Sequence, residues 1–368
     1  MERLMTMRLI TYLMQLLAAG LLVPSPWETA SAVDIPRLRQ LAARNNVTSI
    51  LVFGDSSVDP GNNNNLATTF KANFPPYGVD FFSGRPTGRF TNGRLVTDFV
   101  AEALGYANQI PGFLDRRAKK TDKLHGVSFA SAASGYDDLT ANLSNVVPVW
   151  KQLEYLREYK MEVGRMVGRK KAEEMTGNAV FVMSMGTNDF IQNYYSEPTH
   201  RPKQFSLEQY QHYLVSCMAR DIKKMQWQGA RRVAVVGVPP LGCMPLARTL
   251  RDETGCVESY NAVAFSFNSK VKNMLASLTH SLHIKTAFVD AYAIIQAAIN
   301  KPHLYGFAET SKGCCGSGTI EFGEMCKDLT TCSNRSAYLF WDAVHPTEKM
   351  YKIIADEVLN SIAESLLL

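Results

Sequence analysis

The 368-residue sequence has no dense run of charge of one sign, and this absence argues against several classes of partner. Its 39 basic and 34 acidic residues are scattered along the chain and leave a net charge of only +5. The two densest basic stretches, 116–120 and 169–171, are short and typical of solvated loops or helix faces. We therefore expect no nucleic-acid partner.

Long apolar runs are also missing beyond the first 32 residues, since no later segment reaches 18 apolar residues. Arg3 and Arg8, the apolar stretch 9–23 and the small residues at 30–32 follow the layout of a cleaved signal peptide. We expect a signal peptide at 1–32 and a single domain at 33–368 with no membrane span after cleavage, and an uncleaved signal anchor is the alternative. Such a chain enters the secretory pathway, with the extracellular space or cell wall as the expected destination and the ER or Golgi as alternatives.

The cysteines agree with an oxidising compartment. Four of the seven lie within 19 residues among Gly and Ser near the C-terminus, which is typical of disulfides that close a long loop. The candidates are Cys314, Cys315, Cys326 and Cys332, whose pairing the sequence leaves open, and Cys243 with Cys256, which are close enough to close a second loop. Cys217 lies in a helical pattern and is the expected free thiol, whereas a metal site is disfavoured because adjacent cysteines lack ligand spacing. Three glycosylation sequons also fit a secreted chain: those at Asn46, Asn142 and Asn334.

Five short apolar runs alternate with longer stretches of helical periodicity. Continuous rather than alternating apolar strands are typical of a parallel sheet that is covered on both faces. The runs predict one α/β domain with three layers, α/β/α. Strands are expected at 49–53, 127–130, 179–183, 233–238 and 285–289, and helices at 95–104, 150–167, 207–228, 260–280 and 350–366.

Polar residues follow the predicted strands, at the sheet edge where active sites of parallel sheets lie. Ser56 follows the first strand, Gly135 the second and Asn188 the third, and Asp342 and His345 come near the C-terminus. A serine hydroxyl becomes a nucleophile when a histidine takes its proton and a carboxylate orients that histidine. Backbone and amide N–H groups can then stabilise an oxyanion. The set predicts Ser56, Asp342 and His345 as a catalytic triad, and the N–H groups of Ser56, Gly135 and Asn188 as an oxyanion hole.

Three motifs carry a resemblance to a known family: Phe-Gly-Asp-Ser at 53–56, Gly-Thr-Asn-Asp at 186–189 and Asp-Ala-Val-His-Pro at 342–346. In this order and spacing they resemble the conserved blocks of plant-type GDSL esterases/lipases, the SGNH hydrolases, and further likeness covers roughly 48–360. The resemblance implies a flavodoxin-like SGNH fold with a mostly parallel five-stranded sheet, the triad and oxyanion residues named above, and no metal or organic cofactor. Two departures stand out. Ser57 replaces the Leu of the name motif, and Ala132-Ala133 stands where many relatives have Gly-Gly.

The expected activity is carboxylester hydrolysis through an acyl-enzyme on Ser56, with an ester substrate. The substrate could be an acyl lipid or an O-acetylated cell-wall polysaccharide, and the sequence favours neither. Two alternatives stay open: an acyltransferase that uses the same triad, and a catalytically silent secreted binding protein. The sequence does not give the oligomeric state.

Overall fold

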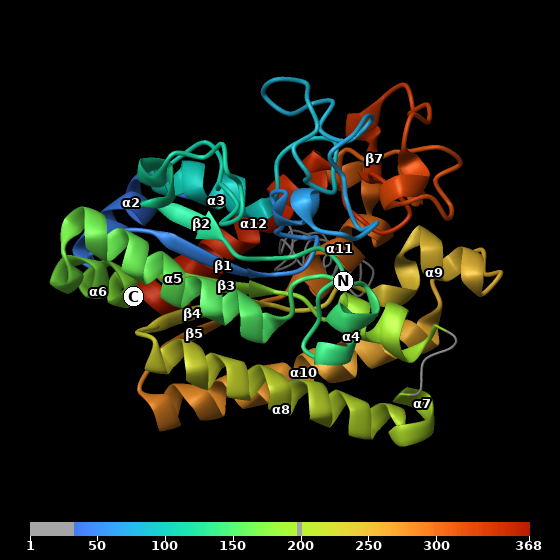
Figure 1. Ribbon diagram of the computed structural model, residues 1–368. Coiled ribbons are helices and arrows are strands. Elements are labelled where there is room, and N and C mark those ends of the chain that lie inside the picture. Colours follow the sequence, from blue (N-terminus) through green and yellow to red (C-terminus); the bar gives the residue numbers. More distant parts are fainter. Residues whose placement is uncertain (1–32, 197–200) are drawn as a thin grey trace, which may run out of the picture. The chain divides into compact units, whose positions relative to one another are not determined.

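Strands with almost uninterrupted apolar side chains form one parallel sheet at the centre of the unit Ile35–Leu368 (Figure 1). The computed structural model describes residues 33–196 and 201–368, so the predicted signal peptide at 1–32 lies outside the described residues. The five strands are β1 (Ile50–Gly54), β2 (Gly126–Ser128), β3 (Val180–Ser184), β4 (Arg232–Val236) and β5 (Lys285–Val289). Their order is β2-β1-β3-β4-β5, and every neighbouring pair is parallel. The predicted sheet is confirmed.

Helices cover both faces of this sheet and complete three layers (Figure 1). One layer contains α5 (Val149–Val167), α6 (Arg169–Asn178), α8 (Leu207–Trp227) and α10 (Glu258–Leu282). The other contains α2 (Ile35–Arg44), α3 (Val96–Leu104), α11 (Ala291–Asn300) and α12 (Glu348–Ile362). The α/β class with three layers is therefore confirmed. The sequence analysis did not predict α2, α6 or α11, each of which spans only 10 residues.

Short elements fill the connections. The remaining α-helices are α4 (Asp138–Leu143), α7 (Arg201–Gln204) and α9 (Pro245–Leu250). The short 3-10 and π turns are η1 (Asn62–Asn65), η2 (Lys120–Lys123), η3 (Asp189–Tyr194), η4 (Leu241–Cys243), η5 (Pro302–Tyr305), η6 (Gly323–Cys326), η7 (Arg335–Ala337) and η8 (Ala363–Leu367). Two further strands, β6 (Glu309–Gly313) and β7 (Tyr338–Phe340), pair in parallel as a small second sheet. These strands flank the cysteine-rich stretch 314–332, for which the sequence analysis predicted a long disulfide-closed loop.

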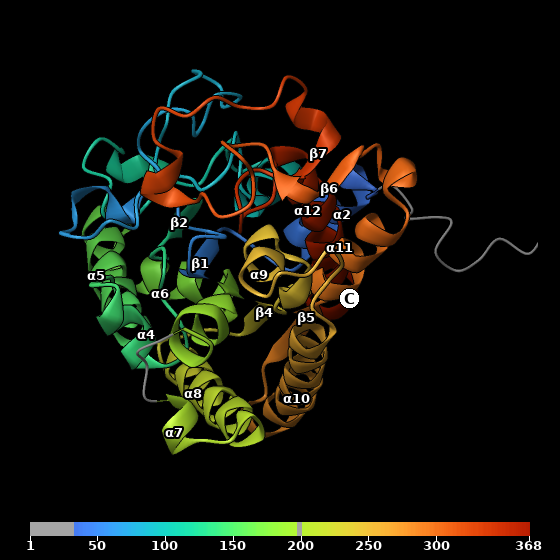
Figure 2. The same cartoon turned by 90° about the vertical axis from the view of Figure 1, so that its right-hand side faces the viewer.

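The two long segments 60–95 and 300–340 lie side by side beyond the carboxyl ends of the strands (Figure 2). An ion pair between Arg335 and Asp80, with Nε and Oδ2 2.7 Å apart, joins them at the surface. Disulfides Cys314–Cys332 and Cys315–Cys326 hold the second segment, and Cys243–Cys256 closes the loop that follows η4. Cys217 is free and buried in α8, as expected.

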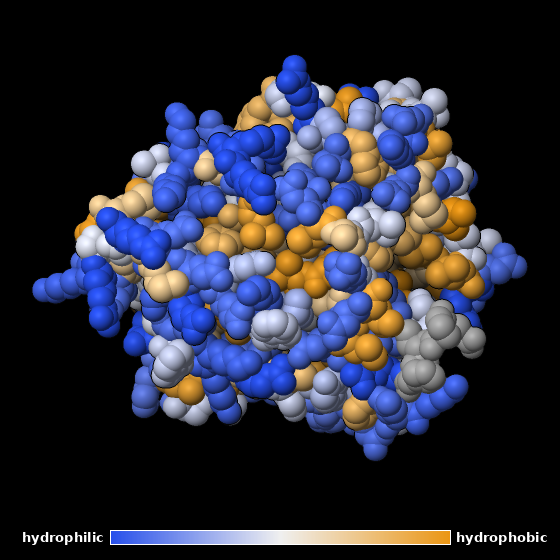
Figure 3. All heavy atoms as spheres, viewed as in Figure 1, coloured by the Kyte–Doolittle hydropathy of each residue, from blue (hydrophilic) through white to orange (hydrophobic). Residues whose placement is uncertain are grey.

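The surface in the view of Figure 3 is mostly hydrophilic, with hydrophobic side chains gathered near the centre and to the right. Within residues 33–196 and 201–368, no helix combines the length and apolar character needed to cross a bilayer.

Candidate active site

The site begins at the point where the strand order reverses. The chain passes from β1 outward to β2 and then returns to β3 on the other side of β1, and ligands of such sheets bind beyond the carboxyl ends of the strands at this switch point. Ser56 follows β1 and Asn188 follows β3, so the two residues flank the switch point. At Gly54 a Cβ would lie 2.2 Å from the carbonyl oxygen of Ser184. Only glycine therefore lets β1 end this close to β3.

Ser56, His345 and Asp342 form one hydrogen-bonded chain. Nε2 of His345 lies 2.8 Å from Oγ of Ser56, and Nδ1 lies 2.8 Å from Oδ2 and 2.9 Å from Oδ1 of Asp342. Asp342 and His345 are buried, while Ser56 keeps partial exposure. The structure thus brings together three residues that the sequence analysis predicted as a triad, in a geometry suited to proton transfer from Ser56.

The turn at 342–345 is shaped by the same carboxylate. Oδ1 of Asp342 accepts the backbone N–H groups of Val344 at 2.8 Å and His345 at 2.7 Å. This local turn brings the imidazole back toward its own orienting carboxylate, which explains why a spacing of three residues suffices. The ring of His345 also packs against Phe90, with ring centroids 4.9 Å apart.

Asn188 is held in one orientation by Gln192. The Oδ1 atom of Asn188 accepts from Nε2 of Gln192 at 2.8 Å, so its Nδ2 must face the other way, where it donates to the Ser134 carbonyl at 2.9 Å. Its second contact, to Oδ2 of Asp55, is long at 3.4 Å. Gln192 lies in η3, four residues after Asn188, and the sequence analysis missed it. Helical spacing of Gln after Asn is the signal that could have found it.

Gly135 has a steric reason to be glycine. A Cβ there would lie 2.2 Å from Oδ1 of Asp189, a buried carboxylate that accepts the N–H groups of Tyr136 at 2.8 Å and Asp137 at 3.1 Å. Ala132 and Ala133, rather than Gly135, line the hollow beside Ser56, and Ala133 has a left-handed φ of 67°. The role of Gly135 as an oxyanion donor stays a prediction, and the backbone N–H of Ala133 is the alternative donor.

Buried carboxyls surround the site. Burial raises the pKa of Asp55, directly before Ser56, to about 6, although Ser57 donates to it through its N–H and hydroxyl. Burial likewise raises the pKa of Asp189 to about 7 and that of Asp59 to about 6. Asp59 accepts the N–H groups of Gly61 and Ala132, so it fastens the segment after Ser56 to the segment after β2.

Two hollows meet at Ser56 and His345. The first is a cavity of about 90 Å³ that runs between the sheet edge and helices α11 and α12. Aliphatic side chains from many elements line it, among them Val58, Val182, Val238, Ile295 and Ile354. The second hollow is smaller, about 30 Å³, and includes Ala132, Ala133, Phe70 and Phe322. An ester bond at Ser56 would therefore have space on both of its sides.

The arginines of the long first segment brace the loop. Arg89 is buried and forms a two-pronged ion pair with Asp98, with both N–O distances 2.8 Å. Arg94 pairs with Glu348 and Glu102, both at 2.9 Å, whereas Arg85 is exposed.

Among the described residues, no group of three His, Cys, Asp or Glu side chains is placed to hold a metal ion.

The family model of GDSL-like lipase/acylhydrolase matches residues 50–358. The chain belongs to this family, whose named plant members are esterases/lipases, a class of carboxylic ester hydrolases. It is 50% identical to the GDSL esterase/lipase At5g45950 of Arabidopsis thaliana over 98% of this chain and 100% of that protein. The Arabidopsis GDSL esterase/lipase At2g42990 is 42% identical over 86% of this chain and 91% of its own length.

Among solved structures, a tail fiber protein from an E. coli phage gives a TM-score of 0.38 at 12% identity, over 91% of this chain and 29% of that chain.

Proposed function

We propose that this GDSL hydrolase is a secreted serine esterase that acts through an acyl-enzyme on Ser56. The observation that carries the proposal is the continuous hydrogen-bonded chain from Ser56 through His345 to Asp342 at the mouth of an apolar cavity. Each member has the partner that its role requires: a base within reach of the hydroxyl, and a carboxylate on the far nitrogen of the base.

In the first half-reaction, Oγ of Ser56 attacks the ester carbonyl carbon as Nε2 of His345 takes the hydroxyl proton. Asp342 holds the Nδ1–H tautomer and stabilises the imidazolium. The tetrahedral intermediate collapses when His345 returns that proton to the leaving alcohol, and this step leaves the acyl group on Ser56. In the second half, His345 takes a proton from water, the resulting hydroxide attacks the acyl carbon, and the carboxylic acid leaves as Ser56 regains its proton.

The oxyanion of both intermediates needs donors fixed in place. Asn188 supplies Nδ2, whose long 3.4 Å contact with Asp55 is easily exchanged for an oxyanion. The backbone N–H of Ser56 is a second donor, and that of Gly135 or Ala133 is a third. Losing one such donor typically lowers the rate by about 100-fold or more.

For the substrate, the aliphatic cavity favours an acyl chain over an acetyl group. The cavity of about 90 Å³ is several times the roughly 10–15 Å³ that is the least a single water-sized group requires. An acetyl group would leave most of this space empty, whereas a chain of about four to eight carbons would bury its methylenes at about 0.8 kcal/mol each. We therefore propose an ester of a short to medium apolar acid as substrate.

Secretion is supported by three disulfides among the described residues and by exposed sequon asparagines at 46, 142 and 334. Disulfides of this kind persist in oxidising compartments. The signal peptide predicted at 1–32 would provide the entry into that pathway.

The test uses purified protein on p-nitrophenyl esters from two to twelve carbons, with acetylated xylan and acylglycerols in parallel. The proposal expects hydrolysis with the highest kcat/KM between about four and eight carbons. Ser56→Ala should abolish this activity, whereas Ser57→Ala, a matched change at the neighbouring hydroxyl, should keep it. Hydrolysis by Ser56→Ala at the wild-type rate would refute the nucleophile. A preference for acetylated xylan would refute the proposed preference for an acyl chain longer than acetyl.

A further inference from the structure

A tyrosine from a distant loop contacts the carboxylate of the proposed triad. Oη of Tyr77 donates to Oδ2 of Asp342 at 2.7 Å, across 265 sequence positions. Oδ2 is one of the two oxygens that face Nδ1 of His345, so the same oxygen accepts from both partners. Both Tyr77 and Asp342 are buried, at 1% and 0% exposure. The hydrogen bond is therefore shielded from water, where bonds to a charged group are strong.

A second hydrogen bond, accepted by the Tyr77 oxygen, fixes the direction of the first. The backbone N–H of Gly323 donates to Oη of Tyr77 at 2.7 Å, and that contact occupies an acceptor position of the phenol oxygen. The hydroxyl proton is left to point at Asp342. Burial and the charge of Asp342 raise the pKa of Tyr77 well above 10, so the phenol stays neutral and remains a donor. Tyr77 thus links η6 to the triad carboxylate.

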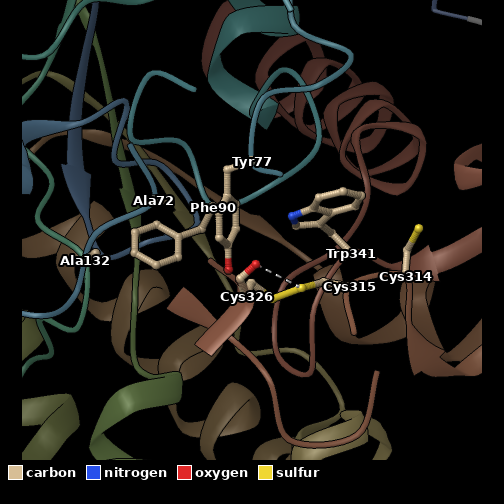
Figure 4. Packing of buried hydrophobic residues seen from close by; sticks show 8 residues of the cluster. All are labelled: Ala72, Tyr77, Phe90, Ala132, Cys314, Cys315, Cys326 and Trp341. Carbon is tan, nitrogen blue, oxygen red and sulfur yellow. Dashed lines mark hydrogen bonds between the residues drawn. A yellow bond between two sulfur atoms is a disulfide. The ribbon is translucent and has the colours of Figure 1, made fainter. Parts of the chain in front are cut away.

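The surroundings allow Tyr77 little freedom. Figure 4 shows its ring among Phe90, Trp341 and the disulfide Cys315–Cys326. The ring meets those of Phe74, Phe90 and Trp341 edge-on, with centroids 5.9, 5.8 and 6.2 Å away. Trp341 directly precedes Asp342, and Phe90 packs on the imidazole of His345. One aromatic cluster therefore holds the tyrosine, the carboxylate and the base together.

We propose that Tyr77 is a positioning residue for the Asp342–His345 pair, which fixes the carboxylate and withdraws charge from the oxygen that faces the imidazole. This inference rests on the proposed function, because it assigns Tyr77 a part in the same proton transfers. Without the phenol, the carboxylate can rotate away from the imidazole, and kcat falls. The carboxylate also becomes more basic, so the pair takes up a proton more readily, and the acidic limb of the kcat/KM profile moves to higher pH.

Other ionisable groups face the same pair. Asp55 interacts with His345 from the loop after β1, and Tyr351 of α12 interacts with Asp342 and with Asp55. The hydrogen-bond partners of the Tyr77 hydroxyl are Asp342 and Gly323 rather than these two groups, so we expect both groups to keep their places in Tyr77→Phe. A movement of the acidic limb in Tyr77→Phe is therefore attributable to the lost hydroxyl.

A purely structural tyrosine would behave differently. Its loss would lower stability while leaving kcat and the pH profile of the folded enzyme unchanged. Tyr159→Phe is the matched control, because Tyr159 is also buried and its hydroxyl donates to a backbone carbonyl, that of Lys123, at 3.0 Å. It belongs to α5 and packs edge-on against Phe129, outside the aromatic cluster around Tyr77.

The experiment measures kcat, KM and kcat/KM from pH 4 to 9 on p-nitrophenyl butyrate for wild type, Tyr77→Phe and Tyr159→Phe. For Tyr77→Phe we expect kcat about tenfold lower, KM within about twofold, and the acidic limb at least about half a pH unit higher. Tyr159→Phe should match wild type in all three.

A second variant keeps the test valid if Tyr77→Phe does not fold. Incorporation of 3-fluorotyrosine at position 77 retains the ring and makes the hydroxyl a stronger donor, so the acidic limb should move to lower pH. A wild-type kcat and pH profile in either substituted protein would overturn the inference. Because Ser56→Ala is assayed alongside, loss of activity there with no effect at Tyr77 would refute the positioning role alone, whereas an active Ser56→Ala would refute the proposed function.

Discussion

Oγ of Ser56 and Nε2 of His345 lie 2.8 Å apart, although 289 positions separate them in the sequence. Ser56 follows β1, the second strand in the spatial order of the sheet, whereas His345 lies in a turn that follows β7, outside the main sheet. The contact therefore depends on how the segment 300–340 is fastened above the sheet edge. Its disulfides and its contacts with the segment 60–95 are part of the site's construction.

Narrowing the cavity should shift the acyl preference. Ala291→Leu adds three carbons to the first turn of α11, where Ala291 lines the cavity. We expect kcat/KM for an eight-carbon ester to fall at least about tenfold while that for a two-carbon ester changes less than about threefold. Ala298→Leu is the control, because Ala298 is buried in the same helix but does not line the cavity. Equal losses on both esters, or the same selectivity change in Ala298→Leu, would contradict the assignment.

Arg89→Ala should act on stability and leave KM unchanged. The guanidinium pairs with Asp98 and donates to the Ile110 carbonyl at 3.0 Å. Removing it leaves the buried carboxylate with two backbone N–H donors but with no opposite charge beside it. Breaking such a pair typically costs about 3–5 kcal/mol. Chemical denaturation should show this loss, while Arg85→Ala, an exposed change in the same segment, should stay within about 0.5 kcal/mol. If Arg89 instead bound substrate, KM would rise with little loss of stability.

Opening the Cys315–Cys326 disulfide should disturb the triad through Tyr77. This bridge anchors η6, whose Gly323 N–H donates to Tyr77. The double change Cys315→Ala with Cys326→Ala should lower stability by about 2–4 kcal/mol and move the acidic limb in the same direction as Tyr77→Phe. Combined with Tyr77→Phe, it should move the limb no further, because the two changes act on one contact. Cys243→Ala with Cys256→Ala should destabilise the protein without moving the acidic limb. Additive shifts of the limb in the combined variant would show that the Cys315–Cys326 disulfide does not act through Tyr77.

Stability should peak in mildly acid solution. The raised pKa values of Asp55, Asp59 and Asp189, about 6, 6 and 7, mean that the folded state binds protons more tightly than the unfolded state between about pH 4 and 7. The stability from these groups is complete below about pH 4 and is lost as the pH rises through 6 to 7. Glu321 has the opposite effect. Burial alone would raise the pKa of Glu321, but hydrogen bonds, first among them the one from the Ser317 side chain, lower it to about 2. The stability that Glu321 contributes is therefore lost as the pH falls from 4.5 toward 2.

Thermal melts from pH 2 to 8 test this sum of opposing effects. The Tm should be highest near pH 4 to 5 and lower at pH 7.5, and Asp55→Asn should flatten the alkaline side. A Tm that rises steadily to pH 8 would contradict the assignment of these carboxyls.

Much of the fold was predictable because its signals are local. Continuous apolar runs such as 179–183 identify buried parallel strands, and the polar residues at their carboxyl ends mark the sheet edge. Two of the three family blocks lie at those ends, so Ser56 and Asn188 could be placed at one site without coordinates. His345 follows β7 outside the main sheet, and the family resemblance, rather than its place in the sheet, assigned it to that site. The short helix α11 was missed because its 10 residues are apolar on nearly all sides and show no clear period.

The supporting contacts were not predictable, since each joins residues distant in sequence. Asn62 belongs to a run of four asparagines that looks like a low-complexity turn, yet its Nδ2 donates to the carbonyls of Ser128 at 2.9 Å and Ala130 at 2.8 Å. Buried Gln152 of α5 similarly bonds both the N–H and the carbonyl of Gly54 at 3.0 Å. The aliphatic cavity has no motif at all, because its lining comes from several separate elements.

The central claim, that Ser56 is the nucleophile of an acyl-enzyme, is tested most directly by a fluorophosphonate probe followed by peptide mass mapping. The account predicts one adduct, on the peptide that contains Ser56, in wild type and in Ser57→Ala, and none in Ser56→Ala. Labelling of a different residue, or no labelling of a folded wild-type protein that hydrolyses esters, would contradict it.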